Sequence, residues 1–237
     1  METVADALSG NPYPGRGVLW ARTLRGTLCG AYFLTGRSAA SRGRTLTLRR
    51  GAGEIVVSPT DETAHDPLRH YVAARERGGW LVYGNGEQVA TVAERLGEGR
   101  APAAALDGLE YEPDPPIFTP RITVAVDLRA GAAWLGAARR SAGGRAAADV
   151  MTLAVRDLAP GDVVLMTTYR SNGKQVATGE PFTEARTQAA DRQGLLAEVW
   201  GSLRPELRVA AAAFEAGRLA DAAIRLAGAG ESGDRLA

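Results

Sequence analysis

The sequence predicts an α+β fold whose sheets are largely antiparallel. Strand-like segments follow one another through the first hundred residues, and turn-forming residues separate them. One helical pattern comes next, strands return after it, and the last part of the chain has a helical, alanine-rich pattern. Because strands and helices do not alternate regularly, this order argues against a doubly wound nucleotide-binding fold.

Length and composition are those of an ordinary folded protein. The chain has 237 residues, of which 45% are hydrophobic and 23% charged, so it can bury a substantial core by itself. We expect one domain over residues 1–226, followed by a flexible, glycine-containing tail over 227–237. The formal net charge of +1 argues against nucleic acid or an anionic membrane as the main partner.

The strands expected in the first hundred residues are apolar, aromatic or β-branched, as residues of a half-buried sheet are. Between the first two lies Arg25-Gly26, which suits a hairpin turn. The expected strands cover residues 17–20, 28–35, 45–48, 54–57 and 79–83.

The middle of the chain begins with a helical pattern over residues 88–100. Val89, Val92 and Leu96 recur at helical spacing, and the glycines after them end the helix. A short helix or loop follows over 102–109. Residues 110–120 contain four prolines, so we expect an ordered loop there. Further strands are expected over 122–126, 133–136, 149–156 and 163–169, and helices over about 183–200 and 205–226.

Few residues could hold a metal ion. Cys29 is the single cysteine, so neither an intrachain disulfide nor a cysteine-built metal centre can form within the chain. The two histidines, His65 and His70, have no third ligand nearby in the sequence. We therefore predict no metal site and no cofactor.

The N-terminal residues carry no recognisable targeting signal. The acidic segment 1–6 lacks the basic region and apolar run of a secretory signal. No apolar stretch approaches the roughly 18 residues that a membrane-spanning helix needs. We expect a cytoplasmic protein without a membrane partner.

Two segments combine arginine with residues that shape the backbone. Residues 11–17 read Asn-Pro-Tyr-Pro-Gly-Arg-Gly, in which the prolines fix the chain and the glycines allow another group to approach closely. Residues 35–44 place three arginines and two serines after a strand, a combination that can bind phosphate. The Walker signature is missing, and a solvated loop remains the alternative for either segment.

Two further segments carry groups suited to acid–base chemistry. Residues 83–86 read Tyr-Gly-Asn-Gly and place a phenol at the end of an expected strand. Residues 111–122 hold carboxylates in a proline-rich frame, which would keep an acid or base in one position. Turn formation explains both segments nearly as well.

These four motifs occur in a fixed order along the chain, with Thr-Gly-Arg-Ser at 35–38 and Tyr-Glu-Pro-Asp and Phe-Thr-Pro-Arg-Ile within 111–122. Together they resemble the archaeal-type IMP cyclohydrolase family and its bacterial relatives. The similarity continues weakly to about residue 215. It implies a four-layer αββα sandwich, similar to that of Ntn hydrolases but without a processed N-terminal nucleophile.

The resemblance also implies the reaction. The family closes formamido-imidazole-carboxamide ribonucleotide (FAICAR) to inosine monophosphate (IMP) with loss of water, in purine biosynthesis. The implied partner is therefore a purine nucleotide, and family members are expected to form homo-oligomers.

An arginine, a tyrosine and a glutamate are assigned to catalysis in that family. By motif these roles fall on Arg42, Tyr83 and Glu112. Arg42 would stabilise charge on the formyl oxygen, as an oxyanion hole does, and the other two would share proton transfer and orientation. The second arginine motif reads Ser-Arg-Gly-Arg, without the Asn expected before its final Arg, so Arg44 remains a rival of Arg42. The loop before Phe-Thr-Pro-Arg also differs from the family pattern, so Glu110 and Asp114 remain rivals of Glu112. The substrate-binding candidates are Arg16, Arg37 and Ser38 for the 5′-phosphate, Asn85, Thr119 and Arg121 for the base and ribose, and Arg44.

Three other functions remain open at this stage. A relative could perform the same cyclodehydration on a different nucleoside or amide in specialised metabolism. A non-catalytic nucleotide-binding protein could keep the fold. An Ntn-type amidohydrolase could expose Cys29 or Thr23 by cleavage, in which case the intact mass would reveal the cut.

Overall fold

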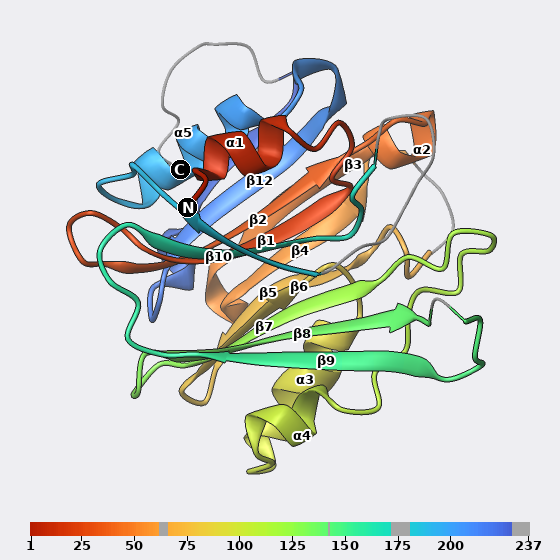
Figure 1. The fold of residues 1–237 in the computed structure, drawn as a ribbon, viewed down its shortest axis with the longest axis horizontal. Helices are drawn as coiled ribbons and strands as arrows, with labels where there is room; N and C mark the ends of the chain where they lie inside the picture. The colour runs from red at the N-terminus through yellow and green to blue at the C-terminus, as the bar shows by residue number, and fades with distance from the viewer. Residues whose placement is uncertain (62–65, 142, 172–180, 229–237) are drawn as a thin grey trace.

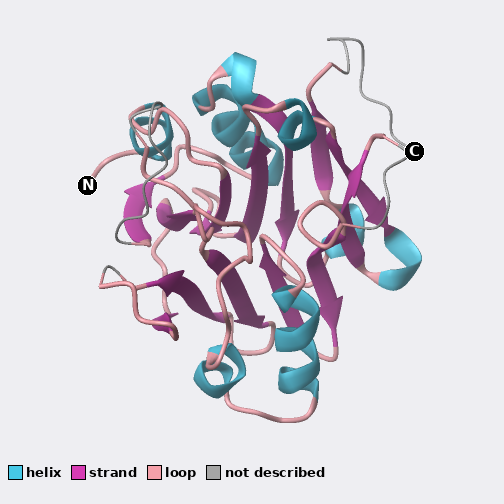
Figure 2. Ribbon diagram, turned by 90° about the vertical axis from the view of Figure 1, so that its right-hand side faces the viewer, coloured by secondary structure: helices cyan, strands magenta, loops and turns pink. Residues whose placement is uncertain are grey.

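The computed structural model describes residues 1–61, 66–141, 143–171 and 181–228. Two large antiparallel sheets dominate this part of the chain, and few helices accompany them (Figure 1; Figure 2). The α+β class and the antiparallel sheets predicted from the sequence are therefore confirmed, and the arrangement is compatible with the predicted sandwich.

The first sheet has six strands among the described residues. In spatial order they are β11 (Phe182–Arg186), β10 (Asp162–Thr167), β1 (Arg16–Arg22), β2 (Leu28–Thr35), β12 (Arg208–Glu215) and β13 (Ala223–Leu226). The second sheet has seven described strands in simple sequence order. They are β3 (Arg44–Arg49), β4 (Glu54–Pro59), β5 (Tyr71–Arg77), β6 (Trp80–Gly84), β7 (Arg121–Asp127), β8 (Ala132–Arg140) and β9 (Ala148–Val155).

The main core lies between the two sheets. Side chains of alternate strand residues point to opposite faces, so each strand contributes to two packing layers. Trp20 and Tyr32 of the first sheet pack in the same buried cluster as Leu81 and Tyr83 of the second. The sandwich is thus held together by large side chains that are fully buried.

Helices cover the outer face of each sheet (Figure 1). Helices α1 (Val4–Ser9) and α5 (Arg192–Ser202) pack on the first sheet, where Leu8 and Leu195 join Phe33 in a second buried cluster. Helices α3 (Gln88–Gly97) and α4 (Pro102–Leu106) pack on the second sheet, where Val92 meets Val82. None of the described helices is long and apolar enough to cross a membrane.

The predicted helices near the C-terminus are largely wrong. The segment 183–200 contains β11 before α5 begins, and the segment 205–226 contains β12, β13 and two short 3₁₀ helices. Strand β12 lies inside the first sheet with alanines opposite Tyr32 and Phe33 of β2, so small residues fit beside large ones. Its two faces are both buried, which gives a continuous apolar run that periodicity cannot distinguish from a buried helix. Of the predicted tail, residues 229–237 lie outside the described residues.

The strand order brings several loops to one end of the sandwich. Strands β1, β3, β5 and β7 begin at this end, and β2, β4, β6 and β10 end there, as the antiparallel registers require. The motifs at 11–17, 35–44, 83–86 and 111–122 all lie beside one of these strand ends. The fold therefore gathers segments that are far apart in the sequence.

Candidate functional site

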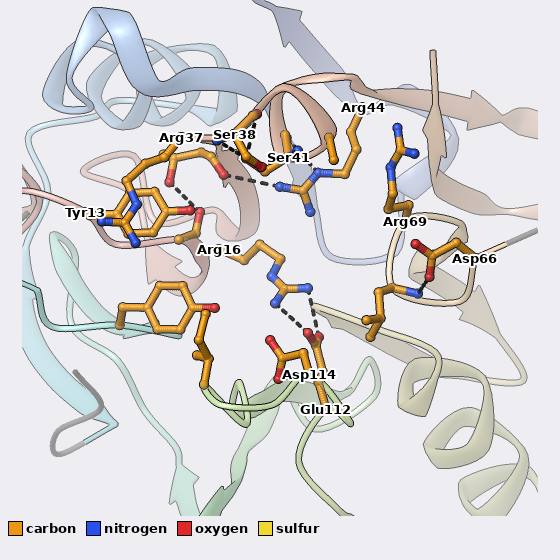
Figure 3. Close-up of a pocket in the computed structure, with 16 residues that line it drawn as sticks. Tyr13, Arg16, Arg37, Ser38, Ser41, Arg44, Asp66, Arg69, Glu112 and Asp114 are labelled. Atoms are coloured by element: carbon orange, nitrogen blue, oxygen red, sulfur yellow. Dashed lines mark hydrogen bonds and ion pairs between the residues drawn. The ribbon is translucent and has the colours of Figure 1, made fainter. Parts of the chain in front are cut away.

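A cavity of about 450 Å³ opens at this end of the sandwich (Figure 3). Its volume lies in the range of small-molecule sites. It is lined by Tyr13, Gly15, Arg16, Thr35, Arg37, Ser38, Ala40, Ser41, Arg44, Asp66, Leu68, Arg69, Glu112, Asp114, Ile117 and Tyr169. Arginines from three segments face carboxylates across it, so the cavity can hold a ligand that carries both anionic and hydrogen-donating groups.

A buried ion pair forms the floor of the cavity. Arg16, at the start of β1, donates from Nη1 to Glu112 Oε1 and from Nη2 to Glu112 Oε2, each over 2.8 Å. Arg16 Nη1 also donates to the carbonyl of Asn85 at 3.1 Å, and Asn85 Nδ2 donates to Glu112 Oε1 at 3.3 Å. Both side chains of the pair are almost fully buried. Such a two-pronged contact fixes the position and orientation of both groups.

Burial changes the proton affinity of both partners. Loss of solvent raises the pKa of Glu112 above its ordinary value of 4.5, and the neighbouring Arg16 opposes this only in part. Loss of solvent alone would lower the pKa of Arg16, but the charge and hydrogen bonds of Glu112, together with the nearby Tyr71 and Tyr169, outweigh it and raise that pKa well above its ordinary value. Arg16 therefore keeps its charge, whereas the charge of Glu112 depends mainly on this partner.

A second group of polar side chains lies on the loop between β2 and β3. Arg44 is held by backbone carbonyls, because its Nε donates to Ser41 at 2.9 Å and its Nη2 to Thr35 at 3.2 Å. The loop is tight at Gly36, where an added Cβ would lie 2.7 Å from the Ser41 backbone. Ser38 and Ser41 share hydroxyl and backbone hydrogen bonds that cap the short helix α2 (Ala39–Arg42). The loop thus presents guanidinium and hydroxyl groups in fixed positions.

Aromatic rings form another wall. The rings of Tyr13 and Tyr169 are stacked with centroids 5.6 Å apart, and the Arg37 guanidinium lies 4.1 Å from the centroid of Tyr13. Gly15 has a φ of +72°, and a Cβ there would lie 2.5 Å from the ring of Tyr169. The glycine in the first motif is therefore what lets Tyr169 approach the backbone.

A chain of hydroxyl groups ends on a carboxylate beside this wall. The hydroxyls of Tyr169 and Thr119 are hydrogen-bonded at 2.5 Å, and Thr119 Oγ1 donates to Asp114 Oδ2 at 2.5 Å. The Thr119 backbone N–H donates to Asp114 Oδ1 at 2.6 Å, and Glu112 N–H donates to the Thr119 carbonyl at 2.8 Å. The proline-rich loop therefore holds Glu112 and Asp114 side by side, facing Arg16 (Figure 3).

The family model described as IMP cyclohydrolase-like protein matches residues 13–218. The chain belongs to this family. Every residue that lines the cavity falls within the matched range. A search of the curated proteins finds no match.

The structure brings half of the predicted site residues to the cavity wall. These are Arg16, Arg37, Ser38, Arg44 and Glu112. Asn85 and Thr119 lie directly behind the wall, fully buried and hydrogen-bonded to wall residues. Five of the predicted residues, from three distant segments, thus line one cavity.

The other three predicted residues do not line the cavity. Tyr83 is fully buried between the sheets, where its hydroxyl donates to the Leu19 carbonyl at 2.7 Å. Arg42 is exposed, and its Nε donates to the Gly36 carbonyl at 3.3 Å. Arg121 pairs with Glu87 at 2.8 Å beside a second hollow at α3. The expected meeting of guanidinium, phenol and carboxylate therefore does not include the phenol of Tyr83.

Several cavity residues were not among the predicted site residues. Tyr13 belongs to the first motif and Tyr169 to the part of the chain with weaker similarity, so the signal was present but was not extended to these two side chains. Asp114 was a rival of Glu112, and both of them line the cavity. Asp66 and Arg69 come from a segment without any motif, and only the fold places them there. His65 lies outside the described residues. In the described ranges, no three His, Cys, Asp or Glu side chains are grouped so that they could hold a metal ion.

Proposed function

We propose that this member of the family is a cyclohydrolase that closes FAICAR to IMP with loss of water. The observation that carries the proposal is the cavity itself, in which the Arg44 guanidinium and the Arg16–Glu112 pair line a space of mononucleotide size. Family membership supports a hydrolase-type enzyme, and the cavity supplies the groups that this ring closure requires.

The reaction needs one stabilised oxygen and two proton movements. The carboxamide nitrogen bonds to the formyl carbon and loses one proton, and the formyl oxygen becomes a hydroxyl. That hydroxyl then leaves as water while the formamido nitrogen gives up its proton, so that atoms and charge balance. Negative charge develops on the formyl oxygen during the attack, and a fixed guanidinium beside it would lower the barrier.

Arg44 is the better candidate for this role than Arg42. Arg44 lines the cavity, is buried, and is oriented by the carbonyls of Thr35 and Ser41, so it is positioned before substrate arrives. Arg42 lies on the exposed side of the same loop. We therefore assign oxyanion stabilisation to Arg44.

The remaining cavity groups suit the nucleotide. Arg37 and Ser38 lie at the exposed rim of the cavity, where a 5′-phosphate can keep part of its hydration, and a guanidinium matches its geometry. Arg16 holds Glu112, and Asn85 and Thr119 support the wall from behind. The homo-oligomer and the cytoplasmic location stay predictions.

The two sheets between helices also suit the Ntn-hydrolase-like sandwich that the resemblance implies, and we propose that likeness together with the function. An Ntn-type amidohydrolase is disfavoured because Cys29 is fully buried inside β2. Burial raises the pKa of the Cys29 thiol to about 12, so a nucleophilic thiolate would be scarce at neutral pH.

The test is conversion of FAICAR by the purified protein, with formation of IMP followed by absorbance. We expect turnover by the wild type, a loss of about 10²–10³-fold in kcat for Arg44→Ala, and little change for Arg42→Ala. Arg44→Lys and thermal unfolding separate a lost guanidinium from a lost fold. Wild-type binding of IMP without turnover would favour the non-catalytic reading, and turnover only of another formylated amide would move the chemistry to a different substrate.

A further inference from the structure

We propose that Tyr169 is the catalytic phenol of this site and takes the carboxamide proton, while Thr119 and Asp114 position it and draw its own proton away. This inference rests on the proposed function. It assigns to Tyr169 the role that the motifs gave to Tyr83, and to Asp114 the acceptor role that they gave to Glu112.

The direction of the hydroxyl chain follows from counting protons. Thr119 has one hydroxyl proton, which it donates to Asp114 Oδ2. The contact between Thr119 and Tyr169 must then use the Tyr169 proton, with the Thr119 oxygen as acceptor. All donors in the chain therefore point toward the carboxylate of Asp114, and the lone pairs of the Tyr169 oxygen remain to accept a proton from a ligand.

Glu112 is poorly placed to act as the base. Each of its carboxylate oxygens accepts a hydrogen bond of 2.8 Å from Arg16, and Oε1 accepts another from Asn85. A proton added there would break the ion pair in a buried environment. Asp114 is only half-buried, and its carboxylate oxygens accept hydrogen bonds from the backbone N–H and the hydroxyl of Thr119. The N–H groups of Ile117 and Phe118 donate to its backbone carbonyl instead.

Other phenols near the cavity are occupied or remote. Tyr83 donates to a backbone carbonyl in the inter-sheet core. Tyr32 and Tyr71 are hydrogen-bonded to each other at 2.7 Å and are not part of the cavity wall. The ring of Tyr13 contacts both the Arg37 guanidinium and the ring of Tyr169, and no hydroxyl relay links it to a carboxylate among the hydrogen bonds of the described residues. Among the described residues, Tyr169 is the cavity phenol that also has a hydroxyl relay to a carboxylate.

The ring of Tyr169 is also held in place. Tyr13 stacks on it, Gly15 allows the close approach, and the backbone N–H of Tyr169 donates to the Pro14 carbonyl at 3.2 Å. A phenol fixed on three sides loses little freedom when substrate binds, which is what a proton-transfer group requires.

The carboxamide loses its proton as the ring closes. The N–H bond breaks and its proton goes to the Tyr169 oxygen, while the pair of electrons forms the new bond from nitrogen to the formyl carbon. The formyl C=O π bond opens at the same time, and its electron pair goes to the formyl oxygen, whose charge Arg44 stabilises. The Tyr169 proton moves to Thr119, and the Thr119 proton moves to Asp114, which becomes neutral. The formyl oxygen then takes a proton from solvent and becomes the hydroxyl, and Asp114 returns its proton to solvent, so that atoms and charge balance. No oxidant, metal or cofactor enters the step.

The experiment compares Tyr169→Phe and Asp114→Asn with Tyr111→Phe. Tyr111 is a matched control on the proline-rich loop, and its hydroxyl donates to the Ala146 carbonyl between β8 and β9. The asparagine oxygen in Asp114→Asn can still accept from the Thr119 backbone N–H. Its NH₂ group would donate to the Thr119 hydroxyl, which would then donate to Tyr169, so the direction of the hydrogen bonds is reversed. We expect kcat for FAICAR closure to fall at least about 10²-fold in both variants, with KM changed by a few-fold at most and the control unchanged. The double variant should be no worse than either single one, because residues of one relay act as a unit.

The split between kcat and KM separates the relay from a structural role. A merely structural change at the cavity wall would raise KM and lower the unfolding temperature of Tyr169→Phe and Asp114→Asn. Loss of the relay lowers kcat and leaves both of these quantities close to the wild-type values. If the wild type turns over FAICAR but Tyr169→Phe keeps its kcat, or the two losses add, the relay is wrong and the proposed function stands. If the folded wild type does not turn over FAICAR, both are wrong.

Discussion

Two tyrosines in this protein show how differently the inter-sheet core and the cavity wall use the same side chain. Tyr83 lies on β6 between the sheets, in edge-on contact with Phe214 at 5.1 Å, and its hydroxyl satisfies a carbonyl of β1. Tyr169 follows β10 at the end of the sandwich, where its hydroxyl meets a relay of side chains. Burial raises the pKa of both phenols, so proton affinity alone does not distinguish them.

The difference comes from strand parity and from position along the strand. On β6, Leu81 and Tyr83 point into the inter-sheet core, whereas Val82 points to the outer helices. The motif at 83–86 begins with Tyr83, which is the last residue of β6 that points into the inter-sheet core. The motif therefore places its tyrosine in the core, and only the loop after it lies near the cavity. The residues after Tyr83 do reach the site, since Asn85 contacts both Arg16 and Glu112.

We expect the largest loss of stability at the floor of the cavity, where Arg16 pairs with Glu112. Arg16→Ala leaves the buried Glu112 carboxylate without its partner, and we expect the free energy of unfolding to fall by about 3–5 kcal/mol. Chemical denaturation measures the loss. Glu87→Gln, which breaks an ion pair whose carboxylate is 58% exposed, is the matched control and should cost at most about 1 kcal/mol. Equal losses in the two variants would mean that burial does not govern the pair.

Tyr83→Phe should lower stability and leave activity nearly unchanged, whereas Tyr169→Phe should lower activity. Removing the Tyr83 hydroxyl leaves the Leu19 carbonyl unpaired in the core, so we expect a stability loss of about 1–3 kcal/mol. Activity of the folded protein should stay within a few-fold of wild type, because the hydroxyl does not reach the cavity. Thermal unfolding and the FAICAR assay on the same samples test this. A large loss of kcat at full stability would return the catalytic role to Tyr83.

Arg37→Ala should affect ligand binding at the rim more than stability. The Arg37 guanidinium lies over Tyr13 on an exposed loop, so its loss should hardly change the unfolding free energy. We expect about a tenfold weaker binding of IMP, the equivalent of about 1.4 kcal/mol, measured by calorimetry. Inosine, which lacks the phosphate, is the control ligand and should bind wild type and variant alike. Equal weakening for both ligands would place the phosphate elsewhere.

Much of the fold could be predicted because local patterns and tertiary packing agree. Strands β1, β2, β7 and β10 are apolar runs bounded by turns, and the sequence located each of them. Strand β12 failed because alanine favours helices, and only its bulky neighbours on β2 explain why a small-residue strand fits. The sequence analysis did not predict strand β5, because its residues show no clear strand pattern.

The site could be predicted in part for a related reason. Motifs identify residues but not the partners of those residues. Arg16 and Glu112 form an ion pair although 96 positions separate them in the sequence. The sequence left Arg42 and Arg44 as rivals, and the turn after Ser38 is what places one outside and the other inside. Asn85 and Thr119 are buried behind the cavity wall because of how the surrounding residues pack, and the spacing of the motifs does not predict this.

The smallest expected effect concerns the pH dependence of stability through Glu112. Its pKa in the folded state is raised above the ordinary 4.5, so the folded state holds this proton over a pH range in which the unfolded chain has lost it. The stabilisation from this group is therefore fully present below about pH 4.5 and is lost as the pH rises through the folded pKa. Each unit of pKa difference corresponds to about 1.4 kcal/mol.

Glu112→Gln isolates this contribution, because glutamine cannot titrate. The stability of wild type relative to Glu112→Gln should fall as the pH rises above 4.5 and then level off, as measured by denaturant unfolding between about pH 4 and 8. Tyr83→Phe, altered in the core, should run parallel to wild type over the same range, because the Tyr83 phenol stays protonated throughout. A relative stability that instead rises with pH would contradict this. It would mean that attraction to Arg16 stabilises the charged Glu112 carboxylate by more than burial destabilises it.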